Sequence, residues 1–535
     1  MTHIAPISRR SFLLSASALA ALSALPRGAF AQDAPVAGGT LTFNVGAEPP
    51  VLFPLTNTGS AVNVGPKIVE GLLTYDFDFN PLPQLATEWR VSDDGLNYWF
   101  RIREGVKWHD GVDFTAEDVA FSILTLKEIH PRGRATFANV TAANVLGPHE
   151  AELVLSGPAP YLLSALAAME SPIIPKHIFE GTQVDTNPAL SAPIGTGPFV
   201  FREWVRGSHI IVERNPDYWD EGKPYLDRII FRFIGDASAA EAALLTREVL
   251  LSLGGVPLSQ IDRVAAEGNL GVETRGYGYI NAVLKAELNL DNPYLANIDV
   301  RHAIAHAIDK NFIVNTIYLG HARAIKGPVN PYLTGFFTDD LPTYEYDLAR
   351  AEALLDQAGY PRGANGTRFA LTIDPHIAVG EYRQTADYVA QQLQSIGIAA
   401  TVRTQDWGAF VTRVYTDRAF DIAIVGISNT FDPSVGIQRL YWSENFRPGV
   451  PFSNGTHYSN PEADRLLEAV AVEIDPVRRR ELFDAFQRIV VTDLPTIDLV
   501  APDSFTLFSQ RVVNHTIGVD GLASNAADIH LLPEG

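Results

Sequence analysis

The sequence predicts an α/β fold with at least two domains, on three observations. Helical and strand patterns alternate along residues 347–425, which is typical of a sheet covered by helices. The chain has 535 residues, well beyond the size of one ordinary hydrophobic core, and 46% of them are hydrophobic. No internal repeat or low-complexity linker is apparent after residue 31, so we expect ordered connections between the domains.

Residues 1–31 have the pattern of a cleavable export signal. Residues 8–13, SRRSFL, form a twin-arginine motif, and an apolar, alanine-rich run leads from there to the small-x-small sequence Ala29-Phe30-Ala31. The apolar run, residues 12–25, is too short to cross a membrane. We therefore expect a twin-arginine signal peptide that is cleaved after about Ala31, a periplasmic protein and no membrane anchor.

Composition excludes several classes of function. The chain contains no cysteine, which excludes disulfides, thiolate catalysis, thiolate metal sites and attachment of a lipid to a leader cysteine. Its formal net charge is −21, and this excess of acids argues against nucleic acid or anionic lipid as a partner. The same excess is compatible with a cationic ligand or simply with solubility, and composition does not choose between the two.

The stretch 86–122 is the most informative part of the chain. Turn signals at residues 94–95 and 110–111 bound a strand in which apolar and polar side chains alternate. Thr115 can then cap a helix, and Asp118 completes a variant of the capping box. Taken by themselves, these residues predict a β-hairpin followed by an amphipathic helix, and they say nothing about function.

The same stretch resembles a known family. Its motifs Ala-x-x-Trp, Asp-Gly-x-x-Tyr-x-Phe-x-x-Arg and Val-Lys-Trp-His-Asp-Gly-x-x-Phe-Thr-Ala-x-Asp-Val resemble, almost position by position, the signature of the extracytoplasmic solute receptors that bind peptides, nickel or opines for ABC importers. Residues 194–219, with Gly-Thr-Gly-Pro-Phe and Asn-Pro-x-Tyr-Trp, and residues 299–310 resemble two further blocks of that family. The resemblance covers essentially the whole chain after the leader.

The resemblance implies a two-lobed periplasmic binding protein fold of type II. It would be of the large kind, with an extra subdomain in the first lobe and a ligand cleft between the lobes. Lobe I would comprise residues 32–275 and 505–535, with the subdomain at about 60–185, and lobe II would comprise residues 276–504. Two chain crossings between the lobes would permit a hinge and resist free separation.

Further elements are expected before the first crossing. A strand at 40–45 leads into a polar, proline-rich loop and a helix at 64–75, and a second helix is expected at 161–169. In the family the first strand, the loop and the helix lie beside the ligand. The resemblance therefore makes the loop residues Asn57, Thr58 and Ser60 candidates for ligand binding.

The later part of the chain predicts a βαβ-type unit. Asp347, Asn460 and Asp475 are expected to cap helices. The expected elements are strands at 369–373, 398–402 and 420–425 and helices at 348–358, 382–396 and 407–415.

Two motifs that suggest other chemistry are rejected. Gly195 and Gly197 could belong to a phosphate-binding loop, but the third glycine that opens a helix is missing. His302 and His306 have the spacing of two zinc ligands, but a zincin also needs a glutamate directly after the first of them, where this chain has alanine. We expect these histidines on the solvent-facing surface of a helix capped by Asp299, and we expect no metal site and no cofactor.

The expected binding site follows the strand at 420–425, because open α/β sheets bind ligands beyond the carboxyl ends of their strands. The family resemblance points to the same loop. Trp407 and Tyr441 are close to it in sequence and could form apolar walls of the cleft, or they could pack in the core of the second lobe. The loop residues expected to bind the ligand are Ser428, Asn429, Thr430 and Asp432.

Position 429 bears on the kind of ligand. Peptide binders of the family place an acidic residue three positions before the Asp-Pro pair to hold the ammonium group of the peptide, and this chain has Asn429 there. Losing that ion pair costs about 1.5–3 kcal/mol, so the resemblance implies an opine, a blocked or cyclic peptide or a neutral polar ligand rather than an ordinary peptide. Asp432 could take over the role, although aspartate before proline more often caps its own loop.

The sequence therefore predicts the periplasmic solute-binding component of an ABC importer, with no catalytic residue. We expect a monomer that captures a peptide-like or opine-like solute by closing its lobes and delivers it to the membrane permease, with the ATPase subunits contacted only indirectly. A receptor for a saccharide or a metal chelate is the main alternative. A periplasmic hydrolase is more remote, because the chain has no Gly-x-Ser-x-Gly motif, no cysteine nucleophile and no spaced metal triad. Scattered histidines and carboxylates could still assemble in space.

Overall fold

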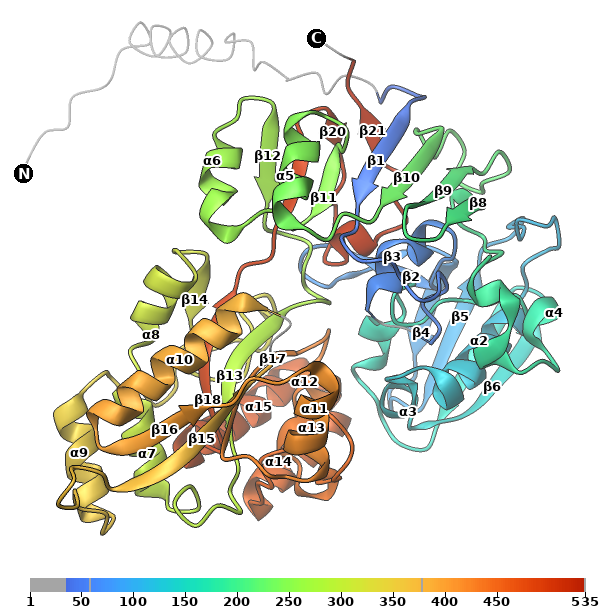
Figure 1. Ribbon diagram of the computed structural model, residues 1–535. Coiled ribbons are helices and arrows are strands. Elements are labelled where there is room, and N and C mark those ends of the chain that lie inside the picture. The colour runs from blue at the N-terminus through green and yellow to red at the C-terminus, as the bar shows by residue number, and fades with distance from the viewer. Residues whose placement is uncertain (1–34, 57–58, 377–378, 534–535) are drawn as a thin grey trace, which may run out of the picture. The chain divides into compact units, whose positions relative to one another are not determined.

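Three sheets, of seven, six and four strands, contain most of the strands of the computed structural model (Figure 1). The expected leader, residues 1–31, and the candidate residues Asn57 and Thr58 lie outside the part of the chain that the structure describes. The described residues are 35–56, 59–376 and 379–533.

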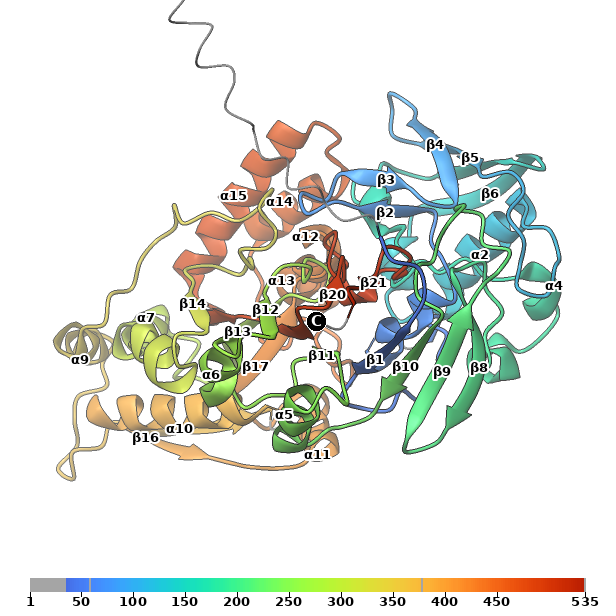
Figure 2. The same cartoon turned by 90° about the horizontal axis from the view of Figure 1, so that it is seen from above.

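The seven-stranded sheet joins strands from both ends of the described chain. In spatial order it consists of β12 (Leu270–Glu273), β19 (Thr506–Ser509), β11 (Leu251–Leu253), β1 (Thr40–Asn44), β10 (Arg228–Arg232), β9 (His209–Arg214) and β8 (Phe199–Val205). β1 pairs in parallel with both β10 and β11, and the other pairs are antiparallel. Figure 2 shows the succession of β1, β10, β9 and β8. The expected first strand is confirmed as β1.

The four-stranded sheet is antiparallel and contains the hairpin expected from the stretch 86–122. Its order is β4 (Ala86–Val91), β5 (Asn97–Ile102), β7 (Glu150–Leu155) and β6 (Val140–Gly147). Alternate residues of β5 are buried, as the pattern predicts. The following helix, α2 (Ala116–Ile129), begins with the expected capping box, in which the backbone N–H of Thr115 donates to the carboxylate of Asp118 at 2.9 Å.

The six-stranded sheet contains all three strands expected between residues 369 and 425. In spatial order it consists of β14 (Ala322–Ala324), β18 (Thr496–Pro502), β13 (Ala282–Leu288), β17 (Ile422–Ser428), β15 (Phe369–Pro375) and β16 (Ile398–Val402). β15 is parallel to both β16 and β17, whereas β13 is antiparallel to β17 and to β18. The expected βαβ arrangement is thus present, with an antiparallel extension.

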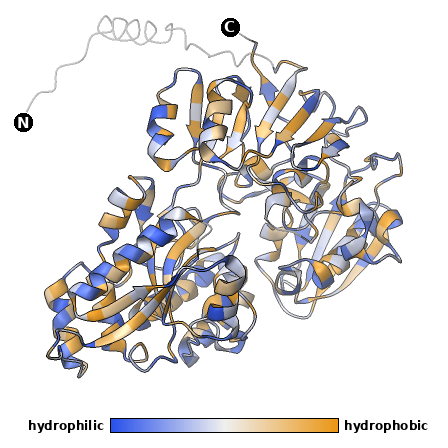
Figure 3. Ribbon diagram, viewed as in Figure 1, coloured by the Kyte–Doolittle hydropathy of each residue, from blue (hydrophilic) through white to orange (hydrophobic). Residues whose placement is uncertain are grey.

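Helices cover both faces of this sheet. Successive residues of β17 point to two different cores, Ile422 and Ile424 to one and Ala423 and Val425 to the other, which explains the uninterrupted apolar run of this strand. Figure 3 shows the apolar strands between helices that carry hydrophilic outer faces. The first core includes α7 (Ile298–Ala307), α9 (Leu348–Gln357) and α10 (Gly380–Ser395), and the second includes α11 (Trp407–Val411), α13 (Gln438–Tyr441), α14 (Pro461–Val472) and α15 (Pro476–Asp493).

Most of the expected helix caps are confirmed. The side chains of Asp347, Asn460 and Asp475 each accept a hydrogen bond from the first turn of the helix that follows. The cap expected at Asp299 is wrong. Asn297 caps α7 instead, since its side-chain oxygen accepts the backbone N–H of Asp299 at 2.9 Å, and Asp299 lies within the first turn.

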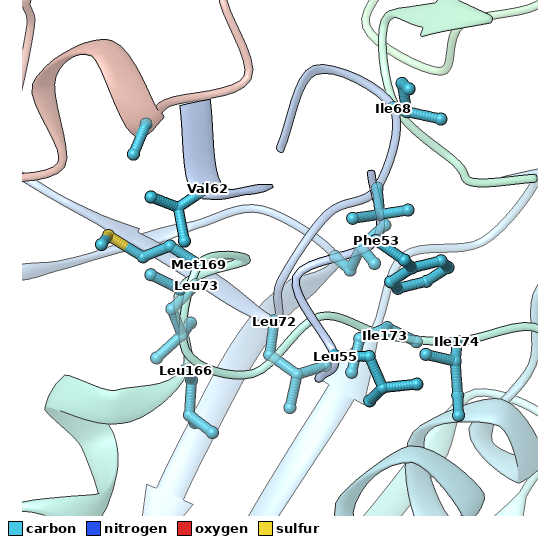
Figure 4. Close-up of a cluster of buried hydrophobic side chains, with 14 of the residues drawn as sticks. Phe53, Leu55, Val62, Ile68, Leu72, Leu73, Leu166, Met169, Ile173 and Ile174 are labelled. Atoms are coloured by element: carbon cyan, nitrogen blue, oxygen red, sulfur yellow. The ribbon is translucent and has the colours of Figure 1, made fainter. Parts of the chain in front are cut away.

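The helix expected at 64–75 is also wrong. Two short 3₁₀ turns, Ser60–Asn63 and Gly65–Lys67, are followed by the strand β2 (Leu73–Tyr75), which pairs with β3 (Pro81–Pro83). The helix expected at 161–169 is reduced to the 3₁₀ helix Leu162–Ala165. Apolar side chains of both segments, such as Leu72 and Leu166, pack into one shared core (Figure 4). Tertiary packing therefore overrides the local pattern.

The Gly-Thr-Gly-Pro-Phe motif has a structural role. A Cβ atom on Gly195 would lie 1.8 Å from the carbonyl oxygen of Ile68, so the two backbones meet where only glycine fits. Thr196 and Trp219 donate hydrogen bonds of 3.0 and 2.9 Å to the fully buried carboxylate of Glu70. Burial raises the pKa of this carboxyl group, and the hydrogen bonds oppose the rise.

The chain passes twice between the seven-stranded and six-stranded sheets, once between β12 and β13 and once between β18 and β19. No helix within the described ranges is long and apolar enough to cross a membrane. The remaining α-helices and strands of the described chain are α3 (Gly133–Thr136), α4 (Lys176–Phe179), α5 (Ala237–Leu245), α6 (Ile261–Ala265), α8 (Lys310–Phe312), α12 (Pro433–Gly436), β20 (Val512–Val513) and β21 (His530–Leu531).

Candidate ligand-binding site

The carboxyl ends of β15, β16 and β17 lie at the same edge of the six-stranded sheet, because these strands are parallel. His376 follows β15 directly, Trp407 begins the helix after β16, and the loop 429–432 follows β17. The candidate residues of the second half of the chain therefore lie on segments that leave one sheet edge, with Tyr441 further along the segment after β17. This is the kind of edge at which open α/β sheets bind ligands.

The loop after β17 turns sharply into α12. Thr430 has a φ of +56°, in the left-handed region that a β-branched residue rarely adopts. A Cβ atom on Gly436 would lie 1.7 Å from the carbonyl oxygen of Asn429, so the turn requires glycine at that position. The carboxylate of Asp432 accepts the backbone N–H of Ser434 at 2.8 Å and caps α12. The capping role considered for Asp432 is therefore confirmed.

Asn429 is fully buried, and the protein itself supplies partners for its side-chain amide. The Oδ1 atom accepts the backbone N–H of Asn330 at 2.6 Å, and Nδ2 donates to the carbonyl oxygen of Pro328 at 3.0 Å. Both ends of the amide thus hold the loop against residues 328–330. Contact between this side chain and a ligand remains a prediction.

The crossing segment before β13 holds the same loop from another direction. The Nδ2 atom of Asn281 donates to the carbonyl oxygen of Thr430 at 3.0 Å, and its Oδ1 accepts the backbone N–H of Asn429 at 3.2 Å. The ring of Tyr279 lies 5.6 Å from the ring of Phe431. The loop is therefore coupled to the segment through which the chain enters the six-stranded sheet.

Asp432 has a second partner besides the cap. The guanidinium of Arg479, on α15, forms a bidentate ion pair with its carboxylate, with distances of 2.8 and 2.6 Å. The two side chains are only 8% and 4% exposed. A ligand ammonium group would have to compete with this arginine, so Asp432 is poorly placed to replace the missing acid at position 429.

Trp407 and Tyr441 lie in different environments. The side chain of Trp407 is 44% exposed and its ring lies 4.6 Å from His376 and stacks on Phe452 at 5.9 Å. This exposed aromatic group remains a predicted wall of the ligand site. Tyr441 is fully buried in the core of the six-stranded sheet, and its hydroxyl bonds the hydroxyl of Thr496 at 2.8 Å, so the structure favours the core alternative for this residue.

Two buried ionisable pairs lie on β13 and its neighbours, alongside residues 423–425 of β17. Lys285 forms an ion pair of 3.1 Å with Asp498; burial acts to lower the pKa of the lysine, but the nearby carboxylate and Tyr441 raise it overall. The carboxylate of Glu287 accepts the hydroxyl of Tyr415 at 3.1 Å. Burial raises the pKa of Glu287 to about 7 against the opposing effect of neighbouring cations.

Arg439, on α13, is a residue of this site that the sequence analysis missed. Its Nε donates to the carbonyl oxygen of Gly436 at 3.1 Å, and Nη2 donates to the carbonyl oxygen of Ser428 at 3.2 Å. The hydroxyl of Ser428 accepts the backbone N–H of Thr430 at 3.1 Å. The local sequence gives no signal for this role, because an arginine in a short helix is usually solvated.

No cluster of three or more histidine, aspartate and glutamate side chains that could hold a metal ion occurs in the part of the chain that the structure describes. His302 and His306, on α7, instead make separate bonds to the backbone carbonyls of Thr492 and Glu345 at 2.8 and 2.7 Å. Near the loop the described structure places an arginine without a carboxylate partner, Arg439, and an exposed aromatic side chain, Trp407, which suits binding of a solute.

Residues 80–449 match the model of the bacterial extracellular solute-binding proteins, family 5, middle part. The chain belongs to this family. As a family-5 protein it is an extracytoplasmic solute-binding protein and not an enzyme, which confirms the predicted resemblance and class of function.

Relatives match this family-5 protein over nearly their whole length. It is 28% identical over 491 residues to the oligopeptide-binding protein AppA of Bacillus subtilis (strain 168), covering 88% of this chain and 87% of the relative. It is 27% identical over 479 residues to the glutathione-binding protein GsiB of Salmonella typhi, covering 87% of this chain and 90% of the relative. Both relatives are binding proteins by name.

Solved structures confirm the fold. The structure of AppA from Bacillus subtilis in complex with a nonapeptide has a TM-score of 0.78 at 26% identity and covers 94% of this chain and 100% of its own. The structure of AgaA from A. tumefaciens R10 in complex with agropinic acid has a TM-score of 0.76 at 25% identity and covers 93% of this chain and 99% of its own. The predicted two-lobed α/β fold of a type II periplasmic binding protein is therefore correct.

Proposed function

We propose that this family-5 protein is the periplasmic receptor of an ABC importer for a solute derived from amino acids, either a peptide-like compound or an opine. The observation that supports this most strongly is the full-length similarity to proteins named for oligopeptides and for glutathione and to one solved with agropinic acid. Oligopeptides, glutathione and agropinic acid are all amino acid derivatives. The receptor would deliver the solute to the transmembrane subunits of the permease, and the ATPase subunits would act from the other side.

Export supports the same proposal. The twin-arginine pattern at residues 8–13 and the cleavage pattern ending at Ala31 would send the protein to the periplasm. N-terminal sequencing of the protein purified from the periplasm tests this, with Gln32 expected as the first residue. A first residue within the leader would contradict it.

Capture by closure follows from the two chain crossings. We place lobe I at residues 32–275 and 505–535, including a subdomain at about 60–185, and lobe II at residues 276–504. A permease can distinguish liganded from empty receptor only if the two shapes differ in free energy of docking. Small-angle scattering is expected to show a smaller radius of gyration with saturating solute, and an unchanged radius with binding confirmed independently would contradict closure.

The solute-binding loop favours a solute that does not depend on a free ammonium group. Asn429 carries no charge, and the carboxylate of Asp432 is already paired with Arg479. Calorimetric titration of the mature protein with free dipeptides and with their N-acetylated forms tests this. We expect affinities within about tenfold of each other. A roughly hundredfold loss on acetylation would show that another carboxylate binds the ammonium group.

A further inference from the structure

Arg439 differs from the other arginines around the loop. Within the described ranges, its side chain makes hydrogen bonds only to the carbonyl oxygens of Ser428 and Gly436 and forms no ion pair. The neighbouring arginines each have a carboxylate partner, in the pairs Arg479–Asp432, Arg132–Glu170 and Arg418–Asp291.

Arg439 is a partly buried cation whose guanidinium, among the described residues, bonds only carbonyl oxygens. Burial, together with the like charge of Arg132, lowers the pKa of Arg439 to about 10. Glu287 is the anion that attracts it, but the carboxylate of Glu287 is bonded by the hydroxyl of Tyr415 and forms no ion pair with Arg439. Arg439 is only partly buried, and as a cation without an ion pair in the described structure it remains available to an anion from outside.

The other polar groups of the loop are already engaged. The amide of Asn429 is bonded to residues 328–330, and the carboxylate of Asp432 is bonded to Arg479. The hydroxyl of Thr430 donates within its own loop. Of the charged groups that contact the loop in the described structure, Arg439 is thus the one that lacks an opposite charge.

We propose that Arg439 is a specificity-determining residue that binds a carboxylate group of the solute. This proposal rests on the function proposed above and narrows it to solutes that carry a carboxylate close to the loop after β17. The fork of N–H donors in a guanidinium suits a carboxylate, and such charge-assisted pairs are stronger than neutral hydrogen bonds. The neutral Asn429 beside it is consistent with a subsite for an anion rather than for an ammonium group.

The alternative is that Arg439 only fixes the loop through its two carbonyl contacts. A structural role of this kind predicts that Arg439→Gln lowers the melting temperature and weakens the binding of all solutes to the same extent. An anion-binding role predicts that the variant loses affinity only for solutes with a free carboxylate. The ratio of affinities for two matched solutes therefore separates the two roles.

The test is calorimetric titration of the mature wild-type protein and Arg439→Gln with alanyl-phenylalanine and its C-terminal amide. In the wild type we expect the amide to bind about ten- to a hundredfold more weakly. In Arg439→Gln we expect the affinity for the acid to fall by the same factor and the affinity for the amide to change by less than about twofold. Arg439→Lys should recover part of the loss, and Arg478→Gln, whose side chain is 59% exposed, serves as the control.

Equal binding of acid and amide to the wild type, or equal losses in Arg439→Gln, would overturn the proposal and leave the proposed function intact. If neither compound binds, the solute retained by protein purified from its own periplasm is identified by native mass spectrometry and methyl esterification. The proposal is supported if the wild type retains a solute that carries a carboxylate and the Arg439→Gln variant does not retain it. A retained solute without a carboxylate overturns it, and the lack of any bound solute overturns the proposed function together with it.

Discussion

Arg479 and Asp432 form a bidentate ion pair that links α15 to the loop after β17, with N–O distances of 2.8 and 2.6 Å. The same carboxylate caps α12. One aspartate therefore fixes both the start of a helix and its distance from another helix.

Replacing Asp432 by asparagine should destabilise the protein strongly. The substitution leaves the buried cation of Arg479 without a counter-charge, which costs about 3–5 kcal/mol in free energy of unfolding. Urea denaturation measures the change. Glu462→Gln, which breaks an exposed pair with Arg465, is the control and should change stability by less than about 1 kcal/mol. A comparably small effect of Asp432→Asn would contradict the role of the ion pair.

Gly436→Ala should shift the backbone of the loop and lower the stability of the protein. The added Cβ atom would approach the carbonyl oxygen of Asn429 to 1.7 Å, so the backbone has to move, at a cost of about 1–3 kcal/mol or more. We expect a lower melting temperature and weaker solute binding. Gly380→Ala, at the start of α10 with no atom within 4 Å of the added Cβ, should be neutral or slightly stabilising. Similar melting temperatures for the two variants would show that the loop tolerates the shift.

Glu287 should make stability depend on pH. Burial raises its pKa in the folded state to about 7, above its unfolded value of about 4.3, so its contribution to stability is fully present below about pH 4 and is lost as the pH rises towards 7. Relative to the wild type, Glu287→Gln should therefore gain about 1.4 kcal/mol per pH unit within that window.

Urea denaturation of wild type and Glu287→Gln between pH 4 and 8 measures this difference. Glu180→Gln, whose side chain is 63% exposed, is the control. Parallel stability curves for wild type and Glu287→Gln would show that this carboxyl group titrates normally in the folded protein.

Trp407→Ala and Tyr441→Phe should separate binding from stability. Because Trp407 is 44% exposed, its loss should weaken solute binding and change the free energy of unfolding by less than about 1 kcal/mol. Tyr441→Phe removes a buried hydroxyl that is bonded to Thr496 and Lys285, so it should lower stability by about 1–2 kcal/mol and leave affinity unchanged. Unchanged affinity with a lower melting temperature in Trp407→Ala would assign Trp407 to the core.

The pattern of the sequence predicted the elements whose formation is decided locally. Thr115 and Asp118 form the expected capping box, and β16 spans the expected residues 398–402. Local signals failed where tertiary packing decides the outcome. The segment 64–75 has a helical pattern, yet it forms short turns and a strand because it packs into a core shared with distant segments.

The candidate site was predictable only at the level of the loop. Strand polarity and family resemblance locate residues 428–432, since the carboxyl end of a parallel strand is a general binding position. Which side chains remain free depends on partners that are distant in sequence. Arg479 pairs with Asp432, Asn330 bonds Asn429, and neither contact leaves a trace in the local sequence.

Native mass spectrometry of the protein purified from its own periplasm would identify the bound solute. We expect a single bound mass that is released on unfolding, fragments into amino-acid-derived pieces and carries a free carboxylate. A bound saccharide or a bound metal chelate without amino acid fragments would contradict the assignment of this receptor to peptide-like or opine-like solutes.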